Sequence, residues 1–158
     1  MLKHYSISAM LAGLFLLVGA SHAGNDPREQ GYEVLKNPQP TANPERIEVL
    51  EFFAYTCGHC YNFEVGYLGK WTPPEGVDFR KIPVNFGGKV EAMIRGYYTA
   101  EILGIEKEFH PALFREYKKK RGRFKSGEEV AEFASQFDVS KEDFLGTYNS
   151  FAVEVRMN

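Results

Sequence analysis

The feature that most constrains this chain is a buried-strand pattern that runs directly into two closely spaced cysteines. The segment 46–55, RIEVLEFFAY, is rich in β-branched and aromatic residues, which is typical of an interior strand of a parallel sheet. Cys57 and Cys60 follow in the sequence Cys-Gly-His-Cys, where we expect a helix to begin. The unpaired N–H groups and the helix dipole would stabilise a thiolate at Cys57, so the pattern predicts a redox site.

Two other interpretations of the cysteine pair are disfavoured. A zinc site would need two further ligands, but the chain has only two cysteines, and of its four histidines only His59 and His110 lie beyond the first 23 residues. A purely structural disulfide is disfavoured because closing so short a loop would contribute only about 2 kcal/mol.

The first 23 residues predict a cleaved secretory signal peptide. Lys3 precedes an apolar run from 7 to 20, and Ser21-His22-Ala23 has small residues at the alternate positions that signal peptidase favours. The apolar run is 14 residues long, which is shorter than the roughly 20 residues of a membrane-spanning helix. We therefore expect cleavage after Ala23 and an oxidising, extracytoplasmic location for the mature chain.

The composition is that of a soluble globular protein, with 44% hydrophobic and 25% charged residues. Without the signal peptide, 18 Lys and Arg (19 less Lys3) face 21 Asp and Glu, which gives a formal charge of −3. A nearly neutral chain has no general electrostatic attraction for nucleic acid or anionic membrane, so we expect no nucleic-acid partner. The basic cluster 118–123 is interpreted as a solvated helix end capped by Gly122.

Strand and helix patterns alternate around the cysteines. Tyr32–Leu35 is a short strand candidate ahead of the main strand, and the helix after Cys60 should continue through Leu68. A second strand is predicted at Val77–Val84. Because Pro83 cannot donate a backbone hydrogen bond, it should lie near the end of that strand or at a bulge.

From residue 87 onward the apolar periodicity becomes helical. Ser126-Gly-Glu-Glu129 and Ser140-Lys-Glu-Asp143 have the pattern of capping boxes at helix starts, and we expect the last helix to continue to the end of the chain. Apolar side chains recur at helical spacing and should form a core rather than bind a cofactor: Met93, Ile94, Tyr97, Tyr98, Ile102, Leu113, Phe114, Tyr117, Val130, Phe133, Ala134, Phe137, Phe144, Leu145 and Tyr148.

The segment Glu48–Glu64, EVLEFFAYTCGHCYNFE, together with Pro83-Val-Asn-Phe86 and the helical block after it, resembles the DsbA thiol:disulfide oxidoreductases. The resemblance extends from about Tyr32 to the end of the chain. It implies an α/β, thioredoxin-like fold with an inserted all-helical domain, with the thioredoxin-like part at 24–86 and the insertion at 87–158. It also implies an enzyme that donates disulfides.

The resemblance assigns roles to the cysteine motif. Cys57 corresponds to the nucleophile, His59 to the residue that stabilises its thiolate, and Cys60 to the buried partner. Gly58 is a candidate for redox tuning, because the dipeptide between the cysteines influences the pKa of the nucleophile; here it is Gly-His, where the best-known DsbA proteins have Pro-His.

Three charged residues are further candidates. Glu51 interrupts an apolar strand, and burial of a lone carboxylate is costly unless it is protonated or paired. Its family counterpart is a buried acid beneath the active site, and Glu51 with Glu64 and Lys81 resembles the charged residues thought to tune proton transfer at the second cysteine. Glu64 and Glu48 could equally be surface carboxylates.

The resemblance also implies partners and one missing part. The substrates would be reduced, unfolded secreted proteins, and a quinone-linked membrane partner of the DsbB type would reoxidise the enzyme in the periplasm. We expect no cofactor beyond the redox-active Cys57–Cys60 disulfide. No proline follows Pro111, so the family's cis-proline loop and the C-terminal part of the sheet should be missing. Alternatives are a disulfide isomerase or reductase, and an inactive truncated fragment that acts only as an interaction module.

Overall fold

The computed structural model describes residues 31–86, 90–120 and 124–158. The chain separates into two units, and the boundary between them in the sequence lies between Gln39 and Pro40. In the described part of the first unit, 31–39, there is no helix or strand, so the strand expected at Tyr32–Leu35 is wrong. The side chains of Tyr32, Val34 and Leu35 are 53%, 66% and 66% exposed, and two alternating apolar residues do not make a strand without a hydrogen-bonded neighbour.

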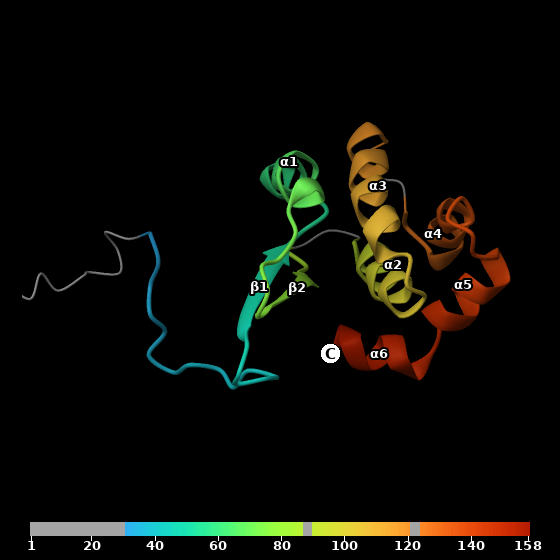
Figure 1. Ribbon diagram of the computed structural model, residues 1–158. Coiled ribbons are helices and arrows are strands. Elements are labelled where there is room, and N and C mark those ends of the chain that lie inside the picture. Colours follow the sequence, from blue (N-terminus) through green and yellow to red (C-terminus); the bar gives the residue numbers. More distant parts are fainter. Residues whose placement is uncertain (1–30, 87–89, 121–123) are drawn as a thin grey trace, which may run out of the picture. The chain divides into compact units, whose positions relative to one another are not determined.

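The second unit begins with a parallel strand pair. Strand β1 (Ile47–Phe53) pairs with β2 (Val77–Pro83), from Ile47 opposite Val77 to Phe53 opposite Pro83. Helix α1 (Gly58–Gly66) and the short 3₁₀ helix η2 (Leu68–Lys70) connect the strands (Figure 1). Both predicted strands are confirmed, and Pro83 ends β2 as expected.

The two faces of β1 differ in burial because successive strand side chains point to opposite sides. Phe53 is 1% exposed, whereas Phe52 is 61% exposed. Glu51 has the same parity as Phe53, so its carboxylate lies on the face that packs against the core. The Glu51 side chain is therefore directed toward the core, two residues before the end of β1.

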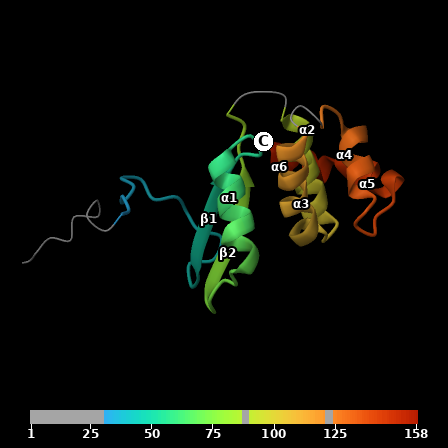
Figure 2. The same ribbon diagram turned by 90° about the horizontal axis from the view of Figure 1, so that it is seen from above.

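In the described residues beyond β2 there are five helices. They are α2 (Glu91–Ile102), α3 (Glu106–Lys119), α4 (Gly127–Ala134), α5 (Lys141–Tyr148) and α6 (Phe151–Met157). Helix α2 contacts the other four, and α3 also packs against α1 (Figure 2). This last contact brings the helical part of the chain beside the helix that begins at the cysteines.

The core lies among these helices and against the end of β1. Its fully buried large side chains are Phe53, Met93, Phe109, His110, Leu113, Phe114, Phe124, Val130, Phe144 and Val153. Ten of the fifteen predicted core side chains are buried, and four more, Tyr98, Tyr117, Phe137 and Leu145, are partly buried against the core. Ile102 is the exception: it is the last residue of α2 and is 38% exposed.

Close helix packing depends on one glycine in particular. A Cβ at Gly96 of α2 would lie 2.6 Å from Cγ1 of Val130 in α4. Glycine at this position therefore allows the two helices to approach more closely than any other residue would.

Serine side chains begin three of the helices. Ser126 Oγ accepts from the N–H of Glu129 at 3.3 Å, and Ser140 Oγ accepts from the N–H of Asp143 at 3.0 Å, which confirms both predicted N-caps. Ser150 Oγ caps α6 in the same way. The segment after Ser140 is thus two helices, α5 and α6, and the expectation of one continuous helix is wrong.

Two other boundaries bear on the sequence predictions. Helix α1 ends at Gly66, two residues earlier than expected, because glycine is a weak helix former. The signal peptide at 1–23 and the cap at Gly122 lie outside the described residues. Within the described ranges, none of the helices has the length and apolar character needed to cross a membrane.

Candidate redox site

Cys57 is the N-cap of α1. Its backbone is extended, with φ −85° and ψ 116°, and its Sγ accepts a hydrogen bond of 3.3 Å from the N–H of Cys60. The N–H of Cys57 itself donates to the carbonyl of Ala54 at 2.9 Å. The predicted placement of the first cysteine at a helix start is confirmed, and its sulfur faces the unpaired N–H groups of the first turn.

The two thiols are shifted in opposite directions. Hydrogen bonds from the side chain and backbone of Cys60, and from the backbone of His59, lower the pKa of Cys57. Burial and the hydrogen bond with Cys57 raise the pKa of Cys60. The sulfurs are not bonded to each other in this structure, and the arrangement favours a thiolate at Cys57 and a protonated thiol at Cys60.

The two residues between the cysteines are exposed. His59 contributes to the thiolate through its backbone N–H, while its imidazole lies at the surface. Gly58 is the first residue of α1, and no atom lies within 4 Å of the position that a Cβ would occupy. Position 58 is therefore open to a larger side chain.

Glu51 acts electrostatically on the second cysteine. Its Oε2 is buried and has no hydrogen-bond partner in the described part of the chain. Burial, followed by repulsion from Glu64 and Glu106 and opposed by attraction to Lys81, raises the pKa of Glu51 to about 7. The carboxyl group in turn contributes to the raised pKa of Cys60. An acid of this pKa can both give and take a proton near neutrality.

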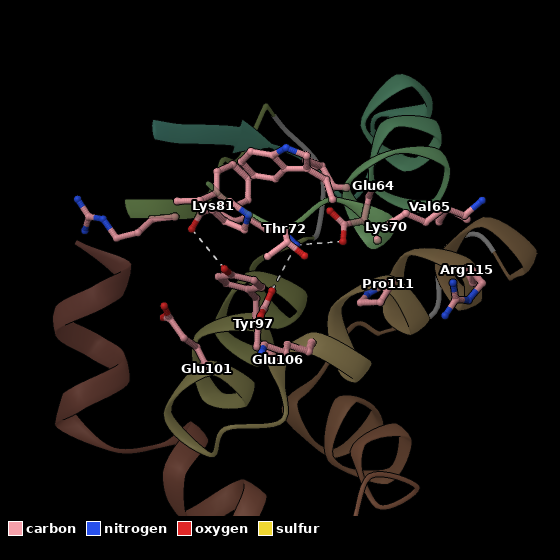
Figure 3. Close-up of a pocket in the computed structure, with 17 residues that line it drawn as sticks. Glu64, Val65, Lys70, Thr72, Lys81, Tyr97, Glu101, Glu106, Pro111 and Arg115 are labelled. Atoms are coloured by element: carbon pink, nitrogen blue, oxygen red, sulfur yellow. Dashed lines mark hydrogen bonds and ion pairs between the residues drawn. The ribbon is translucent and has the colours of Figure 1, made fainter. Parts of the chain in front are cut away.

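Glu64 and Lys81 form a buried ion pair. Lys81 Nζ lies 3.0 Å from Glu64 Oε1 and 3.5 Å from Glu106 Oε1 (Figure 3). Glu64 is 2% exposed, so the alternative of a surface carboxylate is wrong for it. Burial opposes ionisation of Glu64, but His110 and Lys81 outweigh it and lower its pKa. Glu48 instead pairs with Arg80.

His110 was not among the redox residues predicted from the sequence. This residue of α3 is fully buried, with Nδ1 2.9 Å from the Tyr55 hydroxyl and Nε2 3.5 Å from Glu64 Oε2. One signal was present: His110 stands three and four residues before Leu113 and Phe114, so it extends their apolar stripe toward the helix start.

A groove of about 780 Å³ opens beside the ion pair. Figure 3 shows Glu64 from α1, Lys81 from β2, and Tyr97 and Glu106 from α2 and α3 along its wall. Neither cysteine is among the described residues that line it. Among the described residues, no group of three His, Cys, Asp or Glu side chains is arranged to hold a metal ion.

Curated relatives cover nearly the whole chain. The thiol:disulfide interchange protein DsbA of Pseudomonas aeruginosa is 35% identical in an alignment 158 positions long that covers 99% of this chain and 74% of the relative. The protein of the same name from Burkholderia cepacia is 33% identical in an alignment 157 positions long that covers 96% of this chain and 74% of the relative. No protein-family model matches the chain.

Solved structures agree with these relatives. A crystal structure of Pseudomonas aeruginosa DsbA is 39% identical with a TM-score of 0.68, and covers 78% of this chain and 65% of its own. The DsbA oxidoreductase of Xylella fastidiosa is 32% identical with a TM-score of 0.63, and covers 72% and 63%. The similarity thus spans about three quarters of the curated relatives and slightly less than two thirds of these solved chains. The fold is the expected α/β thioredoxin-like fold with a helical insertion.

Proposed function

Since this chain belongs to the DsbA family of thiol:disulfide oxidoreductases, we propose that it donates the Cys57–Cys60 disulfide to reduced secreted proteins. The observation that supports this most directly is the opposite shift of the two thiol pKa values at the start of α1. A thiolate of low pKa is a good leaving group, so the reduced form of the pair is stabilised and the disulfide is a strong oxidant.

The reaction is two thiol–disulfide exchanges. A substrate thiolate attacks Sγ of Cys57, the Cys57–Cys60 bond breaks, and Cys60 leaves as a thiolate that takes up a proton. A second substrate thiolate then attacks the substrate sulfur of the mixed disulfide and releases Cys57 as a thiolate. Two substrate thiols are oxidised to one disulfide, and the cysteine pair accepts the two electrons.

Glu51 is the proposed proton donor and acceptor for Cys60. It is near enough to influence the Cys60 thiol, and its pKa of about 7 suits transfer in both directions. Glu64 and Lys81 tune that pKa through their charges. His59 and Gly58 are proposed to adjust the stability of the Cys57 thiolate from the first turn of α1.

The proposed setting is the periplasm, after removal of the signal peptide predicted at 1–23. An oxidising compartment is where a lone cysteine pair of this kind serves to form disulfides. The reduced pair would be reoxidised by a quinone-linked membrane partner of the DsbB type, and no cofactor other than the disulfide itself takes part.

The test is stoichiometric oxidation of a reduced, unfolded protein that contains two cysteines. The oxidised chain should convert it to the disulfide form with matching loss of the Cys57–Cys60 bond, and Cys57→Ser should have no activity. Equilibration with glutathione separates a donor from a reductase or isomerase, because a donor is already reduced in mildly oxidising mixtures. A pair that stays oxidised in reducing glutathione mixtures would contradict the donor assignment.

A further inference from the structure

We propose that Tyr55 and His110 form a positioning pair for Glu64: the Tyr55 hydroxyl fixes the tautomer of the His110 imidazole, and the imidazole holds the Glu64 carboxylate beneath the redox site. This inference rests on the proposed function and deepens it. It adds two residues that contact neither a cysteine sulfur nor the substrate but act through Glu64 and Glu51 on the protonation of Cys60.

The first step is the tautomer of His110. The Tyr55 hydroxyl lies 2.9 Å from Nδ1, and both side chains are buried. Burial raises the pKa of Tyr55 well above its ordinary value, so its hydroxyl keeps its proton and is able to donate. The direction of the bond is set by the other ring nitrogen: Nε2 faces the Glu64 carboxylate, which favours a proton on Nε2 and leaves Nδ1 to accept from Tyr55.

The second step is the direction of that N–H. Nε2 lies 3.5 Å from Glu64 Oε2, and neither atom has a hydrogen-bond partner in the described part of the chain. The contact is longer than an ordinary hydrogen bond, so the N–H acts on the carboxylate as a nearby donor dipole. Burial lowers the pKa of His110, so the imidazole is neutral and serves Glu64 as a single fixed donor.

The third step is the rigidity of the ring. Phe53, Phe114 and Tyr97 surround the imidazole with ring centroids 4.6, 5.1 and 5.2 Å from its own. These rings come from β1, α3 and α2. The imidazole is therefore held from three sides, and its donor cannot turn away from Glu64 without repacking the core.

The two carboxylate oxygens of Glu64 contact residues from two different elements. Oε2 faces His110 of α3, and Oε1 accepts from Lys81 of β2 at 3.0 Å. With Oε1 hydrogen-bonded and Oε2 facing the imidazole N–H, Glu64 stays ionised, and its charge is one cause of the raised pKa of Glu51. The titratable groups that face this site are Glu51 on β1, Tyr55 in the segment between β1 and α1, Cys60 in the first turn of α1, Lys81 on β2, Tyr97 on α2 and Glu106 on α3.

Loss of the imidazole donor has a defined consequence. Glu64 would lose one of its two partners and would bind a proton at higher pH. A neutral Glu64 no longer opposes ionisation of Glu51, so the Glu51 pKa would fall. Glu51 would then lose its proton, and change from proton donor to proton acceptor for Cys60, at a lower pH.

The experiment compares wild type with His110→Phe, which keeps the ring shape without nitrogen, and His110→Gln, which restores an N–H donor. Glu64 is titrated by carbon NMR of its carboxyl group, assigned with Glu64→Gln. We expect its pKa to rise by about one unit, or tenfold in proton affinity, in His110→Phe and to return toward wild type in His110→Gln. The pH profile of mixed-disulfide resolution should shift to lower pH in His110→Phe.

The resting protein supplies an independent readout. Nitrogen NMR of wild type should show His110 protonated on Nε2, and in Tyr55→Phe the Nδ1 signal should move toward that of an acceptor without a donor. Protonation on Nδ1 in wild type, or an unchanged Glu64 titration in folded His110→Phe, would overturn the proposal. These spectra do not depend on turnover, so failure of wild type to oxidise a reduced protein would reject the proposed function separately.

Discussion

The backbone N–H of Cys60 donates a hydrogen bond to Sγ of Cys57 across 3.3 Å, so the second cysteine stabilises the thiolate of the first. The pKa of Cys60 is shifted in the opposite direction, because its thiol is more buried, shares a side-chain hydrogen bond with Cys57 and faces the charge on Cys57. One turn of helix thereby gives two chemically similar side chains different protonation behaviour.

The first prediction concerns the two thiol titrations. Cys57 should titrate below the unperturbed value of about 8.5 and Cys60 above it. Thiolate absorbance against pH should therefore show a low midpoint in Cys60→Ser and a high midpoint in Cys57→Ser, in samples whose fold is checked by circular dichroism. Two midpoints that coincide near the unperturbed value would contradict the difference in environment.

The second prediction concerns Glu51 and the pH dependence of stability. Because the folded-state pKa is raised from 4.5 to about 7, the folded chain keeps a proton that the unfolded chain releases. The Glu51 contribution to the free energy of unfolding should therefore fall as pH rises through this window. Glu51→Gln should be more stable than wild type at about pH 8 by about 1–2 kcal/mol, after allowance for solvent screening, and similar at about pH 4.

Urea denaturation at both pH values measures this effect. Glu75→Gln is the matched control, because Glu75 is an exposed carboxylate in the loop before β2. If Glu51→Gln and Glu75→Gln respond to pH in the same way, Glu51 is an ordinary solvated carboxylate.

The third prediction concerns the Glu64–Lys81 ion pair. Lys81→Met should reduce the free energy of unfolding by about 3 kcal/mol, because it leaves a buried carboxylate without its cation. Replacing both residues, with Lys81→Met and Glu64→Leu, should recover a large part of the loss. Chemical denaturation of the two single variants and the double variant measures the coupling, and additive losses would show that the pair is not coupled.

The fourth prediction tests the packing of α2 on α4. Gly96→Ala should destabilise the fold by about 1–3 kcal/mol, because the added methyl group would meet Val130. Gly146→Ala in α5 is the control, since no atom lies within 4 Å of its Cβ position, and it should be neutral or stabilising by up to about 1 kcal/mol. Thermal unfolding of the two variants compares them, and equal midpoints would refute the close approach.

Local sequence signals were sufficient for the parts of the fold that depend on neighbours in the chain. The apolar run around Val49 predicted β1, the motif after it predicted the start of α1 at Cys57, and the serines at 126 and 140 predicted two helix starts. In each case the determining residues lie within one turn or one strand of one another.

Long-range contacts could not be predicted in this way. Tyr55 and His110 are 55 positions apart, and their hydrogen bond depends on α3 packing against β1 and α1. Glu64 could not be distinguished from a surface carboxylate, because its burial is set by Lys81 and His110 from two other elements. The strand predicted at Tyr32–Leu35 is absent for the converse reason. Apolar and polar residues alternate there, but no neighbouring strand of the described residues pairs with this segment.

The most direct test of the central claim is the trapping of mixed disulfides by single-cysteine variants. In Cys60→Ser the Cys57 thiolate can attack a disulfide of an extract protein and form a mixed disulfide, and no Cys60 thiolate is present to attack that bond and release the protein. Non-reducing gels of periplasmic extract should therefore show stable adducts that a reductant releases. Cys57→Ser should form almost none, because its remaining thiol, which is partly rather than fully buried, has a raised pKa. Equal trapping by the two variants would contradict the assignment of Cys57 as the nucleophile.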